Sequence, residues 1–155
     1  MNKNQLADLR NETIGFIFQF HYLLPEFTAI ENVLMPQYIK NQKASKEMKE
    51  RAEDLLNMVG LWNVKDNKAN NMSGGEQQRT AIARALINSP SIILADEPTG
   101  NLDSESTENI YDILRGINEK LKTTFIIITH DRRIAEKTDR IIEIKDGRVN
   151  IDIQK

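Results

Sequence analysis

Two acidic residues and a histidine follow apolar runs that are typical of buried strands. The run 92–95 is followed by Asp96 and Glu97, and the run 125–128 is followed closely by His130. Because the carboxyl ends of parallel strands meet at one edge of a sheet, we expect these side chains to lie close together. One carboxylate suits a Mg²⁺ shell and the other suits orienting or deprotonating a water molecule. The alternative is structural, since an acid after a buried strand often caps the next helix and a lone histidine often has no chemical role.

The segment Ser73-Gly74-Gly75-Glu76 carries a second signal. Serine at the N-cap and glutamate at N3 form a capping box, which explains Ser73 and Glu76 on structural grounds alone. It does not explain the two glycines, since each costs a helix about 1 kcal/mol relative to alanine. The glycines fit a helix N-terminus that a phosphate group approaches closely, because free backbone N–H groups bind anions there.

Hydrophobic periodicity places these residues on alternating strands and helices. Continuous apolar strands are typical of a parallel sheet whose two faces are both covered, which indicates an α/β fold. The turn 145–148 predicts that the last strand runs antiparallel to its neighbour. The predicted strands are 14–18, 91–95, 123–129 and 140–144. The predicted helices are a short one ending before Thr13, one from Thr28 that Pro36 stops, 45–59, one opened by Ser73 that ends before Pro90, 105–121 and a short one after Asp131.

Composition excludes several classes of protein. The chain has 155 residues and a formal net charge of −2. Of its residues 39% are hydrophobic and 28% are charged, a composition typical of globular proteins. Without a basic excess, tight nonspecific binding to nucleic acid is not expected. The longest apolar runs fall far short of the ~20 residues of a membrane span. With no cysteine and no visible export signal, we expect a cytoplasmic location.

In their order and spacing, these residues resemble the nucleotide-binding domain of ABC transporters. The segment Met72–Arg79 resembles the signature motif of that family, with Met72 where leucine is usual. The segment 92–103 resembles the Walker B motif running into the D-loop, and His130 resembles the switch histidine. Gln19, which alone would be only a polar residue leaving a strand, resembles the Q-loop glutamine.

The resemblance implies a P-loop NTPase-like α/β fold, with a parallel sheet core and a helical subdomain. We expect a single, incomplete ABC ATPase domain over 1–155. The helical subdomain would cover about 25–90, including the Q-loop exit and the signature helix, and 91–155 would hold the Walker B, D-loop and switch-histidine part. The sequences of residues 18–25 and 99–103 are similar to those of the lipoprotein-release, macrolide-export and antimicrobial-peptide-export branch of the family.

The same resemblance reveals a departure from the family pattern. Family members carry β-strands, an adenine-stacking aromatic residue and a phosphate loop of the form G-x-x-x-x-G-K-S/T before the Q-loop. None of the 7 glycines here precedes Lys and Ser or Thr, so the N-terminal β-subdomain and the phosphate-loop strand are expected to be absent. By family analogy that strand would lie between the strand before His130 and the strand 140–144. Its absence would leave two edges unpaired, which predicts marginal stability and aggregation. Met1 falls at an internal linker of the family, which suggests an internal start or a gene remnant.

For a complete family member, the resemblance implies a head-to-tail homodimer that shares two Mg²⁺-ATP sites. In one subunit, Asp96 and Gln19 would contact the Mg²⁺ site. Glu97 would act on the attacking water and His130 would contact the γ-phosphate, as the catalytic residues. The other subunit would close its signature helix on the same phosphate. The residues implied in ATP binding are Gln19, Ser73, Gly74, Gly75, Glu76, Asp96 and Asp103.

Three functional hypotheses follow. The first is an ABC-type ATPase subunit, of exporter type, on the inner face of the cell membrane. It would dock on an integral-membrane permease through the region from Gln19 to about Tyr38, and these 155 residues alone would be inactive without a phosphate loop. The second is a non-catalytic half-domain or gene remnant that offers only docking and signature-helix surfaces. The third, an unrelated Mg²⁺-dependent hydrolase using Asp96 and Glu97, leaves Ser73–Glu76 and His130 unexplained.

Overall fold

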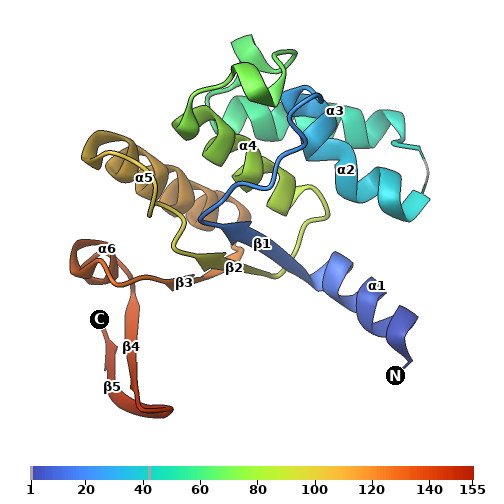
Figure 1. Cartoon of the computed structure of the whole chain (residues 1–155). Coiled ribbons are helices and arrows are strands. Elements are labelled where there is room, and N and C mark those ends of the chain that lie inside the picture. The colour runs from blue at the N-terminus through green and yellow to red at the C-terminus, as the bar shows by residue number, and fades with distance from the viewer. Residues whose placement is uncertain (1, 42) are drawn as a thin grey trace.

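A parallel three-stranded sheet forms the centre of the chain, which a computed structural model describes over residues 2–41 and 43–155. The strand order is β1–β2–β3, and each neighbouring pair is parallel along its full length. An antiparallel hairpin, β4–β5, forms a second sheet at the C-terminal end (Figure 1). The α/β prediction is therefore confirmed. The strands are β1 (Ile14–Phe18), β2 (Ile92–Asp96), β3 (Thr124–Ile128), β4 (Arg140–Lys145) and β5 (Arg148–Gln154).

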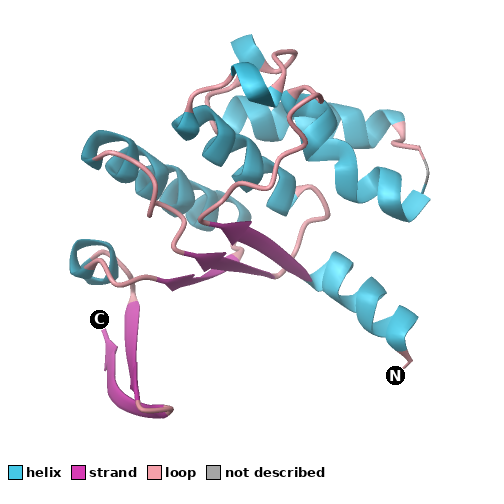
Figure 2. Ribbon diagram, in the orientation of Figure 1, coloured by secondary structure: helices cyan, strands magenta, loops and turns pink. Residues whose placement is uncertain are grey.

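Helices α2 to α5 form a layer on one side of the central sheet. Helices α2, α3 and α4 pack on one another, α4 contacts β1, and α5 contacts β3 (Figures 1 and 2). Within the described residues, no helix has the length and apolar character that crossing a membrane requires. The helices are α1 (Lys3–Thr13), α2 (Ala29–Asn41), α3 (Lys46–Met58), α4 (Gly74–Leu86), α5 (Ser104–Leu121) and α6 (Arg132–Glu136).

Helix α2 continues through Pro36, where the proline was expected to stop it. The helix spans Ala29–Asn41, so Pro36 lies in its interior. An interior proline removes one backbone hydrogen bond and costs about 3 kcal/mol. Tertiary packing outweighs this cost, because Asn32 and Val33 are fully buried and α2 packs against both α3 and α4. The predicted end of this helix was therefore wrong.

The helix-covered face of the sheet carries the core. Alternate strand residues point to the same face, and Ile17, Ile93 and Ala95 on this face are almost completely buried. They belong to one apolar cluster with the inward sides of α4 and α5, which contribute Ile82, Ala83, Leu86, Ile110, Leu114 and Ile117. The strand ends that hold the polar residues are thus anchored from one side.

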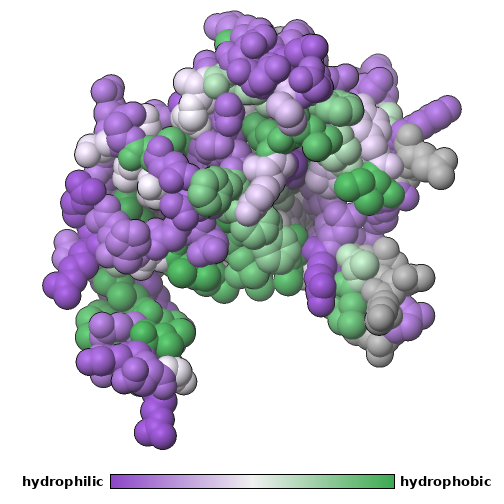
Figure 3. Space-filling model, viewed as in Figure 1, coloured by the Kyte–Doolittle hydropathy of each residue, from purple (hydrophilic) through white to green (hydrophobic). Residues whose placement is uncertain are grey.

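The opposite face of the sheet is exposed and apolar. The rings of Phe16 and Phe18 stack at 6.0 Å, and Ile126 and Ile128 are 48% and 58% exposed. In Figure 3 this apolar surface lies below the helical layer and reappears on the hairpin. Parallel sheets are normally covered on both faces, and here only one face is covered. In addition, none of the described strands pairs with the outer edge of β3. An exposed apolar face beside an unpaired edge promotes association between molecules. Aggregation of this chain therefore remains our prediction.

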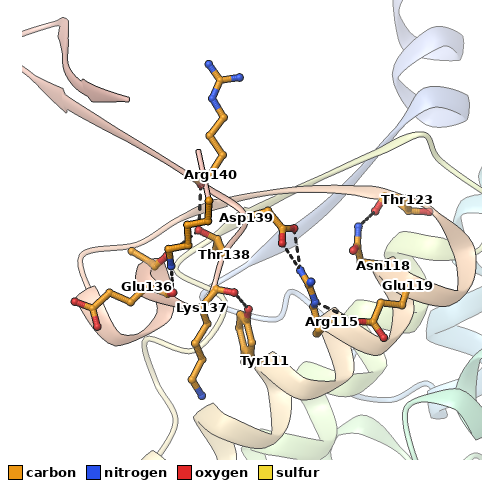
Figure 4. A network of polar contacts seen from close by, with 12 residues as sticks. Tyr111, Arg115, Asn118, Glu119, Thr123, Glu136, Lys137, Thr138, Asp139 and Arg140 are labelled. Carbon is orange, nitrogen blue, oxygen red and sulfur yellow. Dashed lines mark hydrogen bonds and ion pairs between the residues drawn. The ribbon is translucent and has the colours of Figure 1, made fainter. Parts of the chain in front are cut away.

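A polar network holds α6 and the start of β4 against α5 (Figure 4). The Arg115 guanidinium donates to both carboxylate oxygens of Asp139, at 2.9 and 2.8 Å. The Tyr111 hydroxyl donates to the carbonyl of Lys137 at the end of α6. The hairpin is therefore positioned from α5, not by pairing with β3.

Candidate active site

The polar residues predicted at the strand ends lie at one edge of the central sheet. Phe18, Asp96 and Ile128 are aligned across the three strands, so the residues that follow them leave the sheet together. Glu97 follows β2, and Gln19 follows β1. Strand pairing alone therefore brings together side chains that are up to 111 positions apart in the sequence, between Gln19 and His130.

Glu97 joins the ends of β2 and β3. One carboxylate oxygen, Oε1, lies 2.6 Å from Nδ1 of His130 and accepts the backbone N–H of His130 at 3.1 Å. The other oxygen accepts the hydroxyl of Thr129 at 3.4 Å. The Glu97 side chain is 22% exposed and that of His130 is 87% exposed, so the carboxylate is sheltered and the imidazole faces solvent.

The backbone of Glu97 adopts a conformation that side chains disfavour. Its φ is +45°, in the left-handed region, and its amide donates to the carbonyl of Ile128 at 2.9 Å. A non-glycine residue here stores strain, which the surrounding hydrogen bonds must offset. The turn directs the Glu97 side chain toward His130 and away from the path of β2.

The two histidines have opposite electrostatic environments. The Glu97 carboxylate, by hydrogen bond and charge, raises the pKa of His130 above its usual 6.5, with a smaller contribution from Asp131. Burial lowers the pKa of His21, against a hydrogen bond with Gln77 that raises it. At neutral pH His130 therefore retains more of its proton than an isolated histidine does, and His21 retains less.

This difference predicts the titration of the two imidazoles by proton NMR. We expect one histidine resonance to titrate above pH 6.5 and the other below it. Glu97 stabilises the protonated form of His130 in the folded chain. The resulting contribution to folding stability is complete below pH 6.5 and is lost as pH rises through the raised pKa of His130. Glu97→Gln should move the higher titration back toward 6.5 and leave the other unchanged. A His130 resonance that titrates below 6.5 in the parent chain would contradict the Glu97 contact.

Gln19 contacts the loop after β2 through Asn101. The Gln19 Nε2 donates to Oδ1 of Asn101 at 3.3 Å, and Nδ2 of Asn101 donates back to the carbonyl of Gln19 at 3.2 Å. A Cβ on Gly100 would lie 2.7 Å from Gln19 Nε2, so glycine permits this close approach. Sequence reasoning missed Asn101, although an amide side chain within the D-loop-like segment was a visible signal.

Asp96 is aligned with Phe18, the residue before Gln19, at the carboxyl ends of the strands, and it is exposed. Within the described part of the chain its side chain makes no hydrogen bond or ion pair, and no group of three acidic or histidine side chains forms a ready metal cage. Mg²⁺ is commonly held by one or two protein oxygens, with waters and substrate phosphates completing its shell. The Asp96 carboxylate and the Gln19 amide oxygen fit this partial donor set.

The N-terminus of α4 is open to solvent. The predicted capping box is present, because the Ser73 hydroxyl accepts the N–H of Glu76 at 3.3 Å and Glu76 Oε2 accepts the N–H of Ser73 at 2.8 Å. Packing does not require the two glycines, since a Cβ at Gly74 or Gly75 would come no closer than 3.7 or 3.8 Å to its neighbours. The glycines leave a bare helix end, as a closely approaching anion would need.

Asp103 and Gln78 hold the helices around the site, Asp103 by capping α5 and Gln78 by joining α4 to the loop after Glu97. Asp103 caps α5 through hydrogen bonds to the N–H and hydroxyl of Ser106, both at 2.9 Å, which lower its pKa. Gln78, which sequence reasoning missed, is fully buried in α4 and donates to the carbonyl of Pro98 at 2.5 Å. Within the described residues, no hydrogen bond or ion pair joins Ser73 to Glu97 or His130, so these side chains form two separate groups.

The fold and these groups define a family. A model of the ABC transporter family matches residues 1–100. The chain belongs to the ABC transporter ATP-binding family, which confirms the resemblance inferred from the motifs.

The individual relatives are ATP-binding proteins of lipoprotein-releasing systems. The chain is 51% identical over 153 residues to LolD 1 of Chlorobium chlorochromatii, covering 99% of this chain and 62% of the relative. It is 53% identical over 148 residues to LolD of Aquifex aeolicus, covering 96% of this chain and 65% of the relative. The chain thus spans less than two thirds of the length of these curated relatives.

Solved structures agree with the fold. A dimeric ATP-binding cassette in a post-hydrolysis state, bound to ADP and Pi, is 43% identical with a TM-score of 0.83, covering 99% of this chain and 68% of that one. The cassette cbiO1 of Clostridium perfringens, part of the cbiONQ transporter complex, is 28% identical with a TM-score of 0.87, covering 97% and 60%. These structures support a P-loop NTPase-like architecture.

Proposed function

We propose that the chain is the Q-loop, signature and Walker B part of an ATP-hydrolysing ABC transporter subunit. The observation that carries this proposal is the Glu97–His130 contact of 2.6 Å at the sheet edge, with Asp96 exposed beside it. Glu97 would accept a hydrogen bond and then a proton from the attacking water, and His130, which retains its proton more readily, would donate a hydrogen bond to the γ-phosphate. Mg²⁺, held in part by Asp96 and Gln19, would neutralise phosphate charge.

A second subunit would complete each site. Ser73, Gly74 and Gly75 form an open helix end that contacts neither Glu97 nor His130 within the chain. In a head-to-tail homodimer this end would close on the γ-phosphate bound to the partner, with Glu76 fixing the cap and Asp103 at the interface. The dimeric cassette with 43% identity supports this arrangement.

The segment after Gln19 offers a surface for a membrane permease. Phe20 and Tyr22 are 63% and 67% exposed, and with Pro25 and Asn70 they line a pocket of about 220 Å³. Exposed aromatic residues around a concavity are typical of protein interaction sites. The similarity to lipoprotein-releasing proteins supports a subunit of exporter type at the cytoplasmic face of the membrane. We therefore place permease docking between Gln19 and about Tyr38.

A polypeptide of these 155 residues should not hydrolyse ATP alone. The backbone nest and lysine that hold the β- and γ-phosphates in this family have no counterpart in the sequence, and phosphoryl transfer depends on positioning. The open N-terminus of α4, present without a phosphate loop, favours the second candidate function, a non-catalytic half-domain that contributes only its docking and signature-helix surfaces.

A hybrid protein separates the two functions. The hybrid carries the phosphate-loop segment of the Aquifex aeolicus relative ahead of residue 1 of this chain. We expect Mg²⁺-dependent ATP hydrolysis by the hybrid and none by the 155-residue chain. A folded, dimeric hybrid without activity would refute the catalytic role. The half-domain would then be tested by mixing the chain with a full-length relative whose signature serine is replaced.

A further inference from the structure

The chain segment that leaves Gln19 follows an unusual path. Tyr22 has a φ of +48°, in the left-handed region that a bulky side chain disfavours, and its side chain is 67% exposed. The Tyr22 ring meets Phe18 edge-on, with the ring centroids 5.4 Å apart, and the turn is further held by hydrogen bonds to its backbone carbonyls. Two residues later, the N–H of Leu24 donates to Oδ1 of Asn32 at 2.8 Å, which ties the segment to α2.

Arg84 supplies the backbone contacts at the turn. Its Nη1 donates to the carbonyl of Tyr22 and its Nη2 to the carbonyl of His21, both at 2.7 Å. The guanidinium forms no ion pair within the described residues, and burial lowers its pKa. Two carbonyls, spaced to match the planar fork of the guanidinium, are thus its partners.

A second connection runs from the same segment to the start of the signature helix. The Nδ1 of His21 lies 3.2 Å from Oε1 of Gln77. The Nε2 of Gln77 in turn donates to the carbonyls of Ala69 and Met72, each at 3.1 Å, just before Ser73. Arg84 and Gln77 both belong to α4, so the segment leaving Gln19 is bound to the helix whose N-terminus carries Ser73.

We propose that Arg84 is a positioning residue, which holds the backbone after Gln19 on α4 and so fixes the placement of Gln19 relative to Ser73. The inference rests on the proposed function, because Gln19 and Ser73 act there on two different ATP molecules of the dimer. A rigid connection between them means that the metal-facing amide and the signature serine of one subunit move together. Arg84 acts through Gln19 and touches no substrate.

Arg51 provides a matched control. It lies on α3, is likewise partly buried, and donates from Nε and Nη2 to the carbonyls of Ile87 and Leu86, at 2.9 and 3.0 Å. Both arginines therefore make two hydrogen bonds to backbone carbonyls. Those of Arg51 go to the C-terminal end of α4 and not to the segment that leaves Gln19. A purely structural role for Arg84 predicts the same consequences for both substitutions.

The experiment measures ATP hydrolysis by the hybrid protein. We expect Arg84→Met to lower kcat by about tenfold or more with little change in KM, since small misplacements of a site group have effects of this size. Arg51→Met should stay within about twofold of the parent, and Arg84→Lys should recover part of the loss. In a Gln19→Ala background, Arg84→Met should add little, because the group that it positions is already gone.

Amide hydrogen exchange of the 155-residue chain gives an independent readout. Exchange over residues 20–24 should accelerate in Arg84→Met and not in Arg51→Met. Equal losses of kcat for the two arginine variants, or losses of Arg84→Met and Gln19→Ala that multiply, would overturn the inference. An inactive hybrid would refute the proposed function, and the exchange measurement would then decide alone whether Arg84 holds the segment.

Discussion

Glu97→Gln is expected to lower ATP hydrolysis by the hybrid protein by about 10²- to 10⁴-fold, the range typical of losing a general base. Glutamine keeps the size of the side chain, and its amide oxygen can still accept from the N–H of His130. It cannot take a proton from water. Nucleotide binding should persist, so that the variant retains ATP under conditions in which the parent releases ADP. Phosphate release measured under saturating Mg²⁺-ATP tests the rate, and fluorescent-nucleotide titration tests the binding.

Glu105→Gln is the matched control for this substitution. Glu105 is exposed in the first turn of α5 and lies outside the Glu97–His130 contact. Its removal should change the rate by less than about twofold, since charges of exposed residues contribute little. If Glu97→Gln retained the full rate while Glu97→Ala lost it, the carboxylate would serve only to join the ends of β2 and β3.

Gly15→Ala is expected to destabilise the fold by about 3 kcal/mol, at the upper end of the usual range for overpacking. An added Cβ would lie 2.3 Å from Cδ1 of Ile93 and 2.4 Å from the carbonyl oxygen of Ala85. The isoleucine can rotate, but the carbonyl belongs to the backbone of α4, so helix and strand must separate. For a urea m-value of about 2 kcal/mol/M, the unfolding midpoint should fall by about 1.5 M.

Gly116→Ala provides the opposite case. Gly116 lies within α5, and a Cβ there would meet nothing within 4 Å. Alanine in a helix interior is favoured over glycine by about 1 kcal/mol, so this variant should be at least as stable as the parent. Urea unfolding of the hybrid protein, followed by circular dichroism, compares the two. Equal stability of both variants would mean that α4 does not pack on β1 as closely as described.

Most of the fold could be predicted from the sequence, because its elements have strong local signals. Ser45 and Ser73 cap α3 and α4 as expected, and Gly60 adopts a φ of +73° after α3. The apolar runs before Asp96 and Thr129 became the parallel strands β2 and β3. The end of α2 was missed because local propensity at Pro36 competes with burial, which only the packed structure reveals.

The candidate site was predicted in part, according to how each residue is held. Glu97 and His130 follow apolar strands, so a rule of sheet topology sufficed to bring them together. Arg84 and Gln78 gave no such signal, since a polar residue within a helix normally faces solvent. Their partners are the backbone carbonyls of His21, Tyr22 and Pro98. Because every residue has a backbone carbonyl, the sequence does not indicate which of them will accept a hydrogen bond.

The sequence by itself determined the family, the order of the elements and the residue types at each strand end. These depend on local periodicity, capping and motif spacing, all of which can be read directly from the order of residues along the chain. Only the tertiary structure decided that Glu97 pairs with His130, that Arg84 holds the segment after Gln19, and that the face with Phe16 and Ile126 is left exposed. Those features depend on which distant segments meet, because packing and hydrogen bonding act through space and not along the chain.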